Sequence, residues 1–268
     1  MEREGKNKSL EQILGGSHRV VVLAGPAASG KTTAAVAMYK HFSDKIGRSK
    51  CMLLVPNAPA ADHLRRKLLA GSSTGVLVAP RITTFSALAG RVLAAGHPPG
   101  RRLSPFQRRL LLCRLVRQLL DEDKLSALKA VGEAPGLVVA LDRAIAELKR
   151  AAVDPASLAP AVRGREQKER DLLTVYDRYQ QHLQHEGAYD VEGQMWLARD
   201  RLRDACERRE ALPGLENISA WAVDGFTDFT PTQLEILDLI SRQAKRVVIT
   251  LPVADDGRAR MWFWTRRT

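Results

Sequence analysis

The sequence lacks the features that mark membrane-spanning and secreted proteins. Its 268 residues contain no apolar run of about 18 or more, so we expect no membrane-spanning helix. The first residues, MEREGKNKSLEQ, lack the apolar stretch of a secretion signal. Only three cysteines occur, without a CxxC pair, which is typical of unpaired thiols in a reducing compartment. We therefore expect a cytoplasmic protein.

Acidic residues are scarce in the first hundred positions. This part carries 14 Lys and Arg against 5 Asp and Glu, whereas residues 101–210 carry 21 against 18 and residues 211–268 carry 7 against 7. A local excess of positive charge attracts anionic partners such as nucleic acid or nucleotide. The alternative is a basic surface that serves only solubility.

Strand and helix patterns alternate in the first and last parts of the chain. Short apolar, β-branched runs predict strands at 19–24, 51–55, 81–84, 218–223 and 246–251. Helical patterns over 31–42, 59–71 and 231–244 separate them. This order predicts an α/β fold with a parallel sheet.

The middle of the chain lacks this alternation. Amphipathic patterns predict helices over 104–120, 137–153, 168–184 and 191–210. The first has Ser104 as its cap, and Phe106, Leu110, Val116 and Leu119 recur close to helical spacing. We therefore expect residues 1–100 and 211–268 to form one domain, interrupted by a helical insertion at 101–210.

The segment GPAASGKT, residues 25–32, matches the P-loop (Walker A) pattern between a predicted strand and a predicted helix. In such a loop the backbone amides wrap a phosphate, the lysine reaches the β- and γ-phosphates, and the threonine hydroxyl ligates Mg²⁺. We therefore expect ATP and Mg²⁺ as cofactors. The predicted nucleotide contacts are Gly25, Ala27, Ala28, Ser29, Gly30, Lys31, Thr32 and Thr33.

Asp224 ends the strand pattern ISAWAV and supplies the acid that would hold Mg²⁺ together with Thr32. We expect Lys31 and Asp224 at the carboxyl ends of adjacent strands; a turn residue before Gly225 is the alternative role for Asp224. In hydrolysing motors a glutamate that activates water follows this aspartate, and such a base is worth about 10²–10⁴-fold in rate. Gly225 has no side chain. The sequence therefore predicts ATP binding with weak or no hydrolysis, and no catalytic residue.

These motifs together resemble the N-terminal half of a superfamily 1 DNA helicase of the UvrD/RecB kind. LLVPNAPAADHLRRKL (53–68) and ITTFSALAGRVL (82–93) stand at the family's next motif and at its DNA-contacting TFHSL element. VDGFTDFTPTQ (223–233) stands where the family has DEFQDFSPLQ. The glycine after the aspartate and the sequence VDGF…FTP are most similar to the AddB/RexB subunit of bacterial AddAB helicase–nucleases.

The resemblance implies a RecA-like P-loop domain with an inserted helical 1B subdomain. It also implies a largely silent motor subunit of a double-strand-break repair helicase–nuclease, with an AddA/RecB-like subunit and single-stranded DNA or a duplex end as partners. The DNA contacts that it implies lie at strand-to-helix corners, at Pro56, Asn57, Thr84, Phe85 and Ser86. A core aromatic is the alternative role for Phe85.

The family's second RecA-like domain, arginine finger, nuclease element and cysteine cluster have no counterpart in these residues. We therefore expect the N-terminal part of such a subunit. Two other interpretations remain open: a structural scaffold with a relic P-loop, and a small P-loop kinase. In the kinase, RRLSPFQRR (101–109) would serve as a phosphate-binding lid, but the elements TTFSAL and DGFTDFTP would have no explanation.

Overall fold

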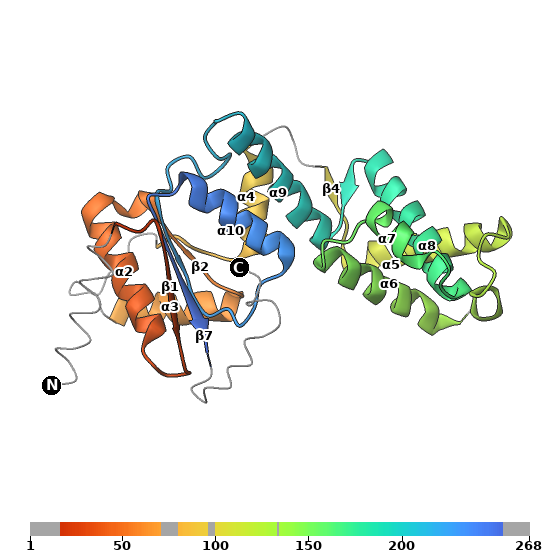
Figure 1. Cartoon of the computed structure of the whole chain (residues 1–268), viewed down its shortest axis with the longest axis horizontal. Coiled ribbons are helices and arrows are strands. Elements are labelled where there is room, and N and C mark those ends of the chain that lie inside the picture. The colour runs from red at the N-terminus through yellow and green to blue at the C-terminus, as the bar shows by residue number, and fades with distance from the viewer. Residues whose placement is uncertain (1–16, 71–79, 96–99, 133, 254–268) are drawn as a thin grey trace. The chain divides into compact units, whose positions relative to one another are not determined.

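The computed structural model describes residues 17–70, 80–95, 100–132 and 134–253 (Figure 1). These residues form a parallel sheet of five strands with covering helices, and a second, helical part. None of the described helices is both long and apolar enough to cross a bilayer.

The sheet is parallel throughout, and its strand order is β1-β7-β6-β2-β3. The strands are β1 (Val20–Gly25), β2 (Cys51–Leu54), β3 (Ile82–Thr83), β6 (Ala220–Val223) and β7 (Arg246–Pro252). The predicted parallel sheet is thus confirmed. Segments from both sides of the helical middle contribute to it, because β6 pairs with both β2 and β7.

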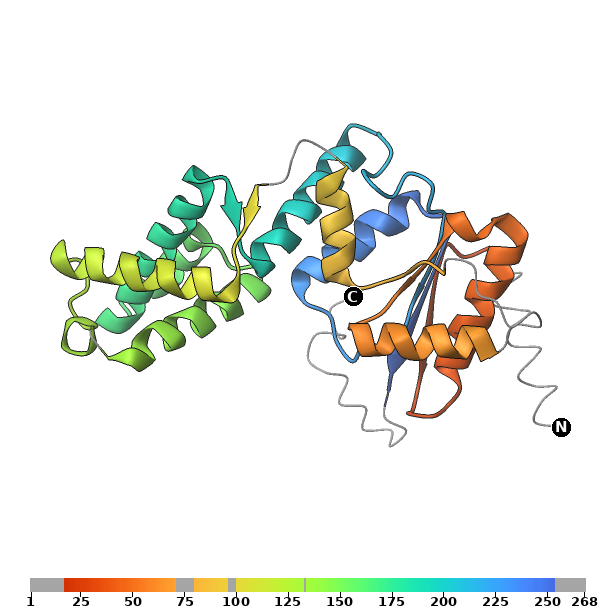
Figure 2. The same ribbon diagram turned by 180° about the vertical axis from the view of Figure 1, so that it is seen from behind.

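Helices cover both faces of this sheet. Figures 1 and 2 show α2 (Lys31–Ile46) on one side, and α4 (Phe85–Ala94) and α10 (Pro231–Gln243) on the other. Side chains of α2 and α3 (Ala58–Ala70) pack with alternate residues of β2 and β6 in one apolar cluster. Every residue of β2 is buried, as expected for an inner strand of a doubly covered parallel sheet.

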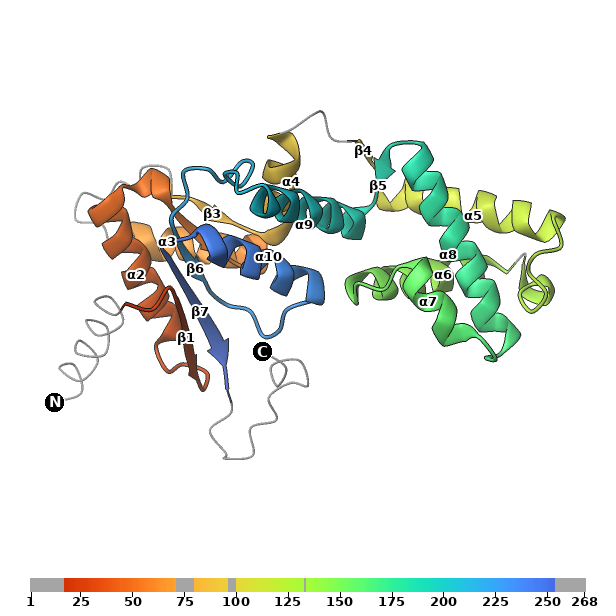
Figure 3. The ribbon, with the colours of Figure 1, turned by 45° about the horizontal axis from the view of Figure 1, so that its top comes forward.

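The described chain divides into two compact units. One holds the sheet and contains the described residues up to Ala95, Asp200–Phe229 and those from Gln233 onward; the other contains those from Gly96 to Arg199 and Thr230–Thr232. Figure 3 shows the helical unit, and α9 (Val191–Glu207) crosses the division. The other elements of the helical unit are β4 (Arg101–Arg102), α5 (Pro105–Asp121), α6 (Pro135–Arg150), α7 (Pro155–Val162), α8 (Gln167–His185) and β5 (Ala188–Tyr189).

Helix α5 begins where the sequence predicts. The Ser104 hydroxyl accepts a hydrogen bond from the Gln107 amide at 3.2 Å, and the Gln107 side chain accepts one from the Ser104 amide at 2.9 Å. The apolar face expected for this helix was partly wrong: Leu119 is buried, but Phe106 and Leu110 are 76% and 60% exposed. At about 100° per residue, Leu110 and Leu119 lie on opposite sides of the helix.

A buried charged cluster joins the helices of this unit. The Lys149 ammonium lies 2.8 Å and 2.9 Å from the two carboxylate oxygens of Asp190, and both side chains are almost fully buried. Asp190 also accepts hydrogen bonds from the Tyr179 hydroxyl and the Gly193 amide. Burial favours a higher pKa for Asp190, but the charge and hydrogen bond of Lys149, the Gly193 amide and the charge of Arg108 together hold that pKa below its usual range.

Candidate functional site

The segment 25–32 joins the end of β1 to the start of α2. Ala28 and Gly30 have left-handed backbone angles, with φ of 60° and 88°. Alternation of left- and right-handed residues makes a backbone concavity whose amides converge on an anion. The amides in the first turn of α2 add donors without intrahelical acceptors. The loop and helix start therefore have the backbone form of a phosphate site, and Ala27, Ala28, Ser29 and Gly30 are exposed along it.

The Lys31 side chain folds over this loop. Its ammonium donates to the Gly25 carbonyl at 2.7 Å, to the Pro26 carbonyl, and to the Ser29 hydroxyl at 3.1 Å. These acceptors match the three protons of an ammonium. Thr33, also expected to contact nucleotide, accepts a hydrogen bond from Lys67 of α3 at 3.1 Å.

Asp224 follows β6 and is 4% exposed. Its Oδ1 accepts a hydrogen bond from the hydroxyl of Thr32, 192 residues away in sequence, at 3.2 Å. The hydroxyl of Thr250 donates to the same oxygen at 2.6 Å. The structure thus brings the loop threonine and the predicted acid together, at the ends of β1 and β6.

The expectation that Lys31 and Asp224 follow adjacent strands was wrong, because β7 lies between β1 and β6. Thr250, on β7, fills that position and bridges to Asp224. The sequence analysis did not identify Thr250 as a site residue. Its signal was a hydroxyl inside the apolar run RVVITLP.

The oxygens at this point suit Mg²⁺ bound together with a phosphate. A hydroxyl that donates its proton to a carboxylate keeps its lone pairs for a metal, so Thr32 can bond to Asp224 and still be a ligand. No cluster of three or more His, Cys, Asp or Glu side chains that could hold a metal occurs in the part of the chain that the structure describes. Mg²⁺ commonly takes one or two protein oxygens and completes its shell with water and substrate phosphates. The residues present therefore fit the cofactor.

Gly225 lacks a side chain and also adopts a backbone conformation that side chains rarely take. Its φ is 85°, in the left-handed region. A Cβ added there would lie 3.4 Å from Cδ of Pro56, an ordinary contact, so space does not exclude a side chain. The backbone angle disfavours one. A glutamate at this position would begin from a strained conformation.

The residues expected to contact DNA lie at the ends of β2 and β3. The Asn57 side chain accepts from the Ala60 amide at 2.9 Å and the Thr84 hydroxyl from the Ala87 amide at 3.3 Å, so each caps a helix. Pro56 and Ser86 are exposed beside them. Because all five strands are parallel, these corners share the carboxyl edge of the sheet with the P-loop and Asp224. Open parallel sheets bind their ligands at this edge.

Phe85 does not offer a surface for a base. It is 5% exposed, and its ring packs edge-on against Phe226 and Phe229, with centroid distances of 5.4 Å and 6.3 Å. The structure therefore favours the core role for Phe85 over the DNA contact that the resemblance implies, because aromatic residues after β6 pack against its ring.

Comparison with known proteins finds a match to a family model described as "ADDB, N-terminal" over residues 22–261. Relatives named as B-type subunits of an ATP-dependent helicase/deoxyribonuclease include those of Caldanaerobacter subterraneus subsp. tengcongensis, at 25% identity, and Pelotomaculum thermopropionicum, at 28%. The alignments cover 85% and 88% of this chain but 19% and 21% of those relatives. The chain thus spans about a fifth of their length.

Proposed function

Because the chain belongs to the family of AddB N-terminal regions, we propose that it is the nucleotide- and DNA-engaging N-terminal module of the AddB-type subunit in a DNA-repair helicase–deoxyribonuclease. The relatives' name, which describes ATP-dependent helicase/deoxyribonuclease subunits of the B type, supports this assignment. In the proposal the sheet unit is a RecA-like P-loop domain and the helical unit its inserted 1B subdomain. An AddA/RecB-like subunit is the partner.

The contact between Thr32 and Asp224 carries the nucleotide part of the proposal. A P-loop sequence alone identifies a candidate, but a nucleotide site also needs an acid near the loop hydroxyl. In this role Lys31 exchanges its loop carbonyls for phosphate oxygens, and the first-turn amides of α2 orient the phosphates. Thr32 and Asp224 would hold Mg²⁺, which would neutralise phosphate charge, and Thr250 holds the Asp224 carboxylate in place.

Weak or absent hydrolysis follows from Gly225. No carboxylate stands after Asp224 to orient and deprotonate water, and general-base catalysis is typically worth about 10²–10⁴-fold. In this proposal bound ATP leaves the module by dissociation rather than by hydrolysis.

The carboxyl edge of the sheet supports the DNA part of the proposal. The corners at Asn57 and Thr84 present helix N-termini, whose amides favour phosphate. Exposed Pro56 and Ser86 complete this surface. The kinase interpretation loses one of its lid arginines, because Arg108 is buried and pairs with Asp142 at 2.6 Å and Glu192 at 2.8 Å.

Isothermal titration of the purified chain with Mg-ATP tests the nucleotide site. Lys31→Ala removes the ammonium of the loop, and we expect it to abolish detectable binding. Lys45→Ala is the matched control, since it removes an exposed lysine from the other end of the same helix and should bind like the wild type. Equal ATP affinity in wild type and Lys31→Ala would contradict a P-loop site, and absence of binding by the wild type would favour the scaffold.

A further inference from the structure

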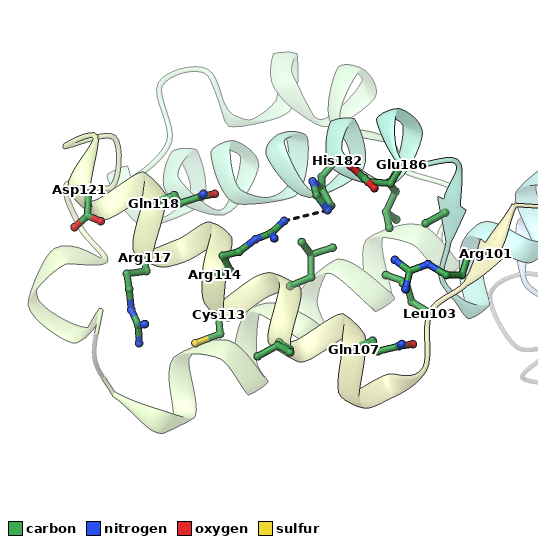
Figure 4. Close-up of a pocket in the computed structure, with 14 residues that line it drawn as sticks. Arg101, Leu103, Gln107, Cys113, Arg114, Arg117, Gln118, Asp121, His182 and Glu186 are labelled. Carbon is green, nitrogen blue, oxygen red and sulfur yellow. Dashed lines mark hydrogen bonds between the residues drawn. The ribbon is translucent and has the colours of Figure 1, made fainter.

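A groove of about 650 Å³ lies along α5 and the C-terminal end of α8, within the helical unit (Figure 4). Its walls include apolar side chains, among them Leu103, Leu110 and Leu183. Figure 4 shows Arg101 toward one end of the groove, Arg117 toward the other, and Arg114 between them. No role described above uses this groove.

The arginines of the groove are not neutralised by nearby carboxylates. Within the described residues, Arg101 and Arg117 have no ion-pair partner, and the Arg114 guanidinium lies 3.2 Å from the imidazole Nε2 of His182. Burial, and then the charge of Arg114, lowers the pKa of His182, which leaves the ring neutral and able to accept this bond. Glu186, the acid beside His182, already lies 3.3 Å from His185.

Other arginines of α5 differ in this respect. Arg108 and Arg109 both pair with Asp142, from distances of 2.6 Å and 3.3 Å. The helix thus separates its cations into a set that holds the helical unit together and a set directed at the groove. Besides Glu186, Asp121 lies at the groove. With a neutral His182, three guanidinium groups face two carboxylates, so the groove favours an anion.

Large apolar side chains lie exposed on α5: Leu110 lines the groove, and Phe106 lies one helical turn before it, outside the lining. Phe106 and Leu110 are 76% and 60% exposed, and they stand four residues apart, so they neighbour each other on the helix surface. Arg114 and Arg117 follow four and seven residues after Leu110, which continues the same stripe. An aromatic face beside phosphate-binding arginines is the combination by which proteins hold unpaired nucleotides.

We propose that this groove binds a segment of single-stranded DNA, with Arg101, Arg114 and Arg117 on its phosphates and with Phe106 and Leu110 against its bases. The proposal rests on the DNA-engaging role proposed above and adds a second contact surface to it. Charge complementarity selects a polyanion as the occupant. Exposed apolar side chains select a single strand, because duplex bases are stacked and unavailable to them.

Fluorescence anisotropy with a labelled 20-nucleotide oligo(dT) tests the arginines. Arg114→Gln with Arg117→Gln should lower the affinity, and the slope of log K against log salt should fall by about 1.4, or 0.7 for each lost phosphate contact. The loss of affinity should then be about sevenfold larger at 50 mM than at 200 mM salt. Arg143→Gln with Arg163→Gln removes the same charge from exposed positions outside the groove and should behave like the wild type.

The apolar contact has a separate signature. Phe106→Ala should weaken oligo(dT) binding about fivefold or more without changing the salt slope. Val131→Ala, which shortens another exposed apolar side chain of the helical unit, is the control and should have no effect. Thermal melting checks that the variants fold. Hydrogen exchange on the wild-type chain gives a variant-independent measure, in which oligo(dT) should protect amides of α5.

The outcomes distinguish the groove from the wider DNA role. If Thr84→Asp with Ser86→Asp lowers the affinity for oligo(dT) but the groove variants do not, the groove is not a DNA-binding surface and the sheet edge remains one. No wild-type binding at 50 mM salt would overturn both. Two results would overturn single-stranded DNA as the occupant of the groove. One is a 20-base-pair duplex that competes with oligo(dT) as well as unlabelled oligo(dT) does, together with unchanged affinity in Phe106→Ala. The other is an acidic amphipathic peptide that binds more tightly than oligo(dT) and loses affinity in the groove variants.

Discussion

Replacement of Gly225 separates two features of this position, the missing carboxylate after Asp224 and the left-handed backbone. Gly225→Glu supplies the missing carboxylate, whereas Gly225→Ala forces a Cβ into the same left-handed backbone conformation but adds no carboxylate. Gly225→Asn should cost less free energy in this conformation, because asparagine tolerates the left-handed region better than other side chains. The three variants together therefore measure the effect of the backbone and of the carboxylate independently.

The expected size of the backbone effect follows from the structure. At φ of 85° an L-residue costs about 1–2 kcal/mol, and the reduced freedom of the unfolded chain returns about 0.4–1 kcal/mol. The added Cβ lies 3.4 Å from Pro56, so no steric clash enlarges this cost. We expect Gly225→Ala and Gly225→Glu to lower the free energy of unfolding by about 1 kcal/mol each, and Gly225→Asn by less.

Urea unfolding and steady-state Mg-ATP hydrolysis provide the two measurements. The left-handed backbone places the Cβ of a residue at 225 next to Pro56. We therefore expect the ATP hydrolysis rate of Gly225→Glu to lie within about tenfold of that of Gly225→Ala. A correctly positioned base would raise the rate by about 10²–10⁴-fold. A rate increase of that full size would refute the backbone argument. If Gly225→Ala and Gly225→Asn have the same free energy of unfolding as the wild type, the left-handed backbone at residue 225 does not strain a side chain.

Two further predictions concern buried polar contacts. Thr250→Val removes the 2.6 Å donor to Asp224 at nearly constant volume, so we expect unfolding free energy to fall by about 1.5–3 kcal/mol in urea, with weaker Mg-ATP binding by calorimetry. Lys149→Met leaves the Asp190 carboxylate buried without its cation, and should cost about 3–5 kcal/mol. Because the pKa of Asp190 is lowered in the folded protein, its ionisation stabilises the fold at pH values above its unfolded pKa of about 3.9. This contribution is lost as the pH falls through the folded pKa. In urea unfolding measured across pH, Lys149→Met should therefore show a smaller loss of unfolding free energy at acidic pH.

The strands were predictable because their signal is local. Each is a short apolar run, and several end at a residue that stops a strand, such as Gly25 or Pro252. Their order is not local: β7 inserts between β1 and β6 through pairing between segments more than 200 residues apart. The segment 25–32 and Asp224 could therefore be chosen as candidates from sequence, and the structure brings Thr32 and Asp224 together, but the contribution of Thr250 required the sheet order.

The helical unit shows a different limit. Phe106 and Leu110 were expected on the apolar face of their helix, yet they are exposed. Lys149 and Asp190, for which the sequence predicted no role, pair in the interior of the unit. Helical spacing tells which residues share a face but not which face a neighbouring helix covers. The short helix α7 was also missed, although Asp154 caps it by accepting from the Ser157 amide at 2.7 Å.

A nucleotide site without a base has a physical consequence of its own. Lys31 follows β1, Thr250 lies on β7 and Asp224 follows β6, so Mg-ATP held by them links the ends of three strands. Ligand binding at 100 times its Kd stabilises a fold by about 2.7 kcal/mol. Where hydrolysis is absent, that stabilisation persists instead of cycling with each turnover. In the proposed role this site would act as a fixed clamp on the carboxyl edge and would hold the Asn57 and Thr84 corners in place.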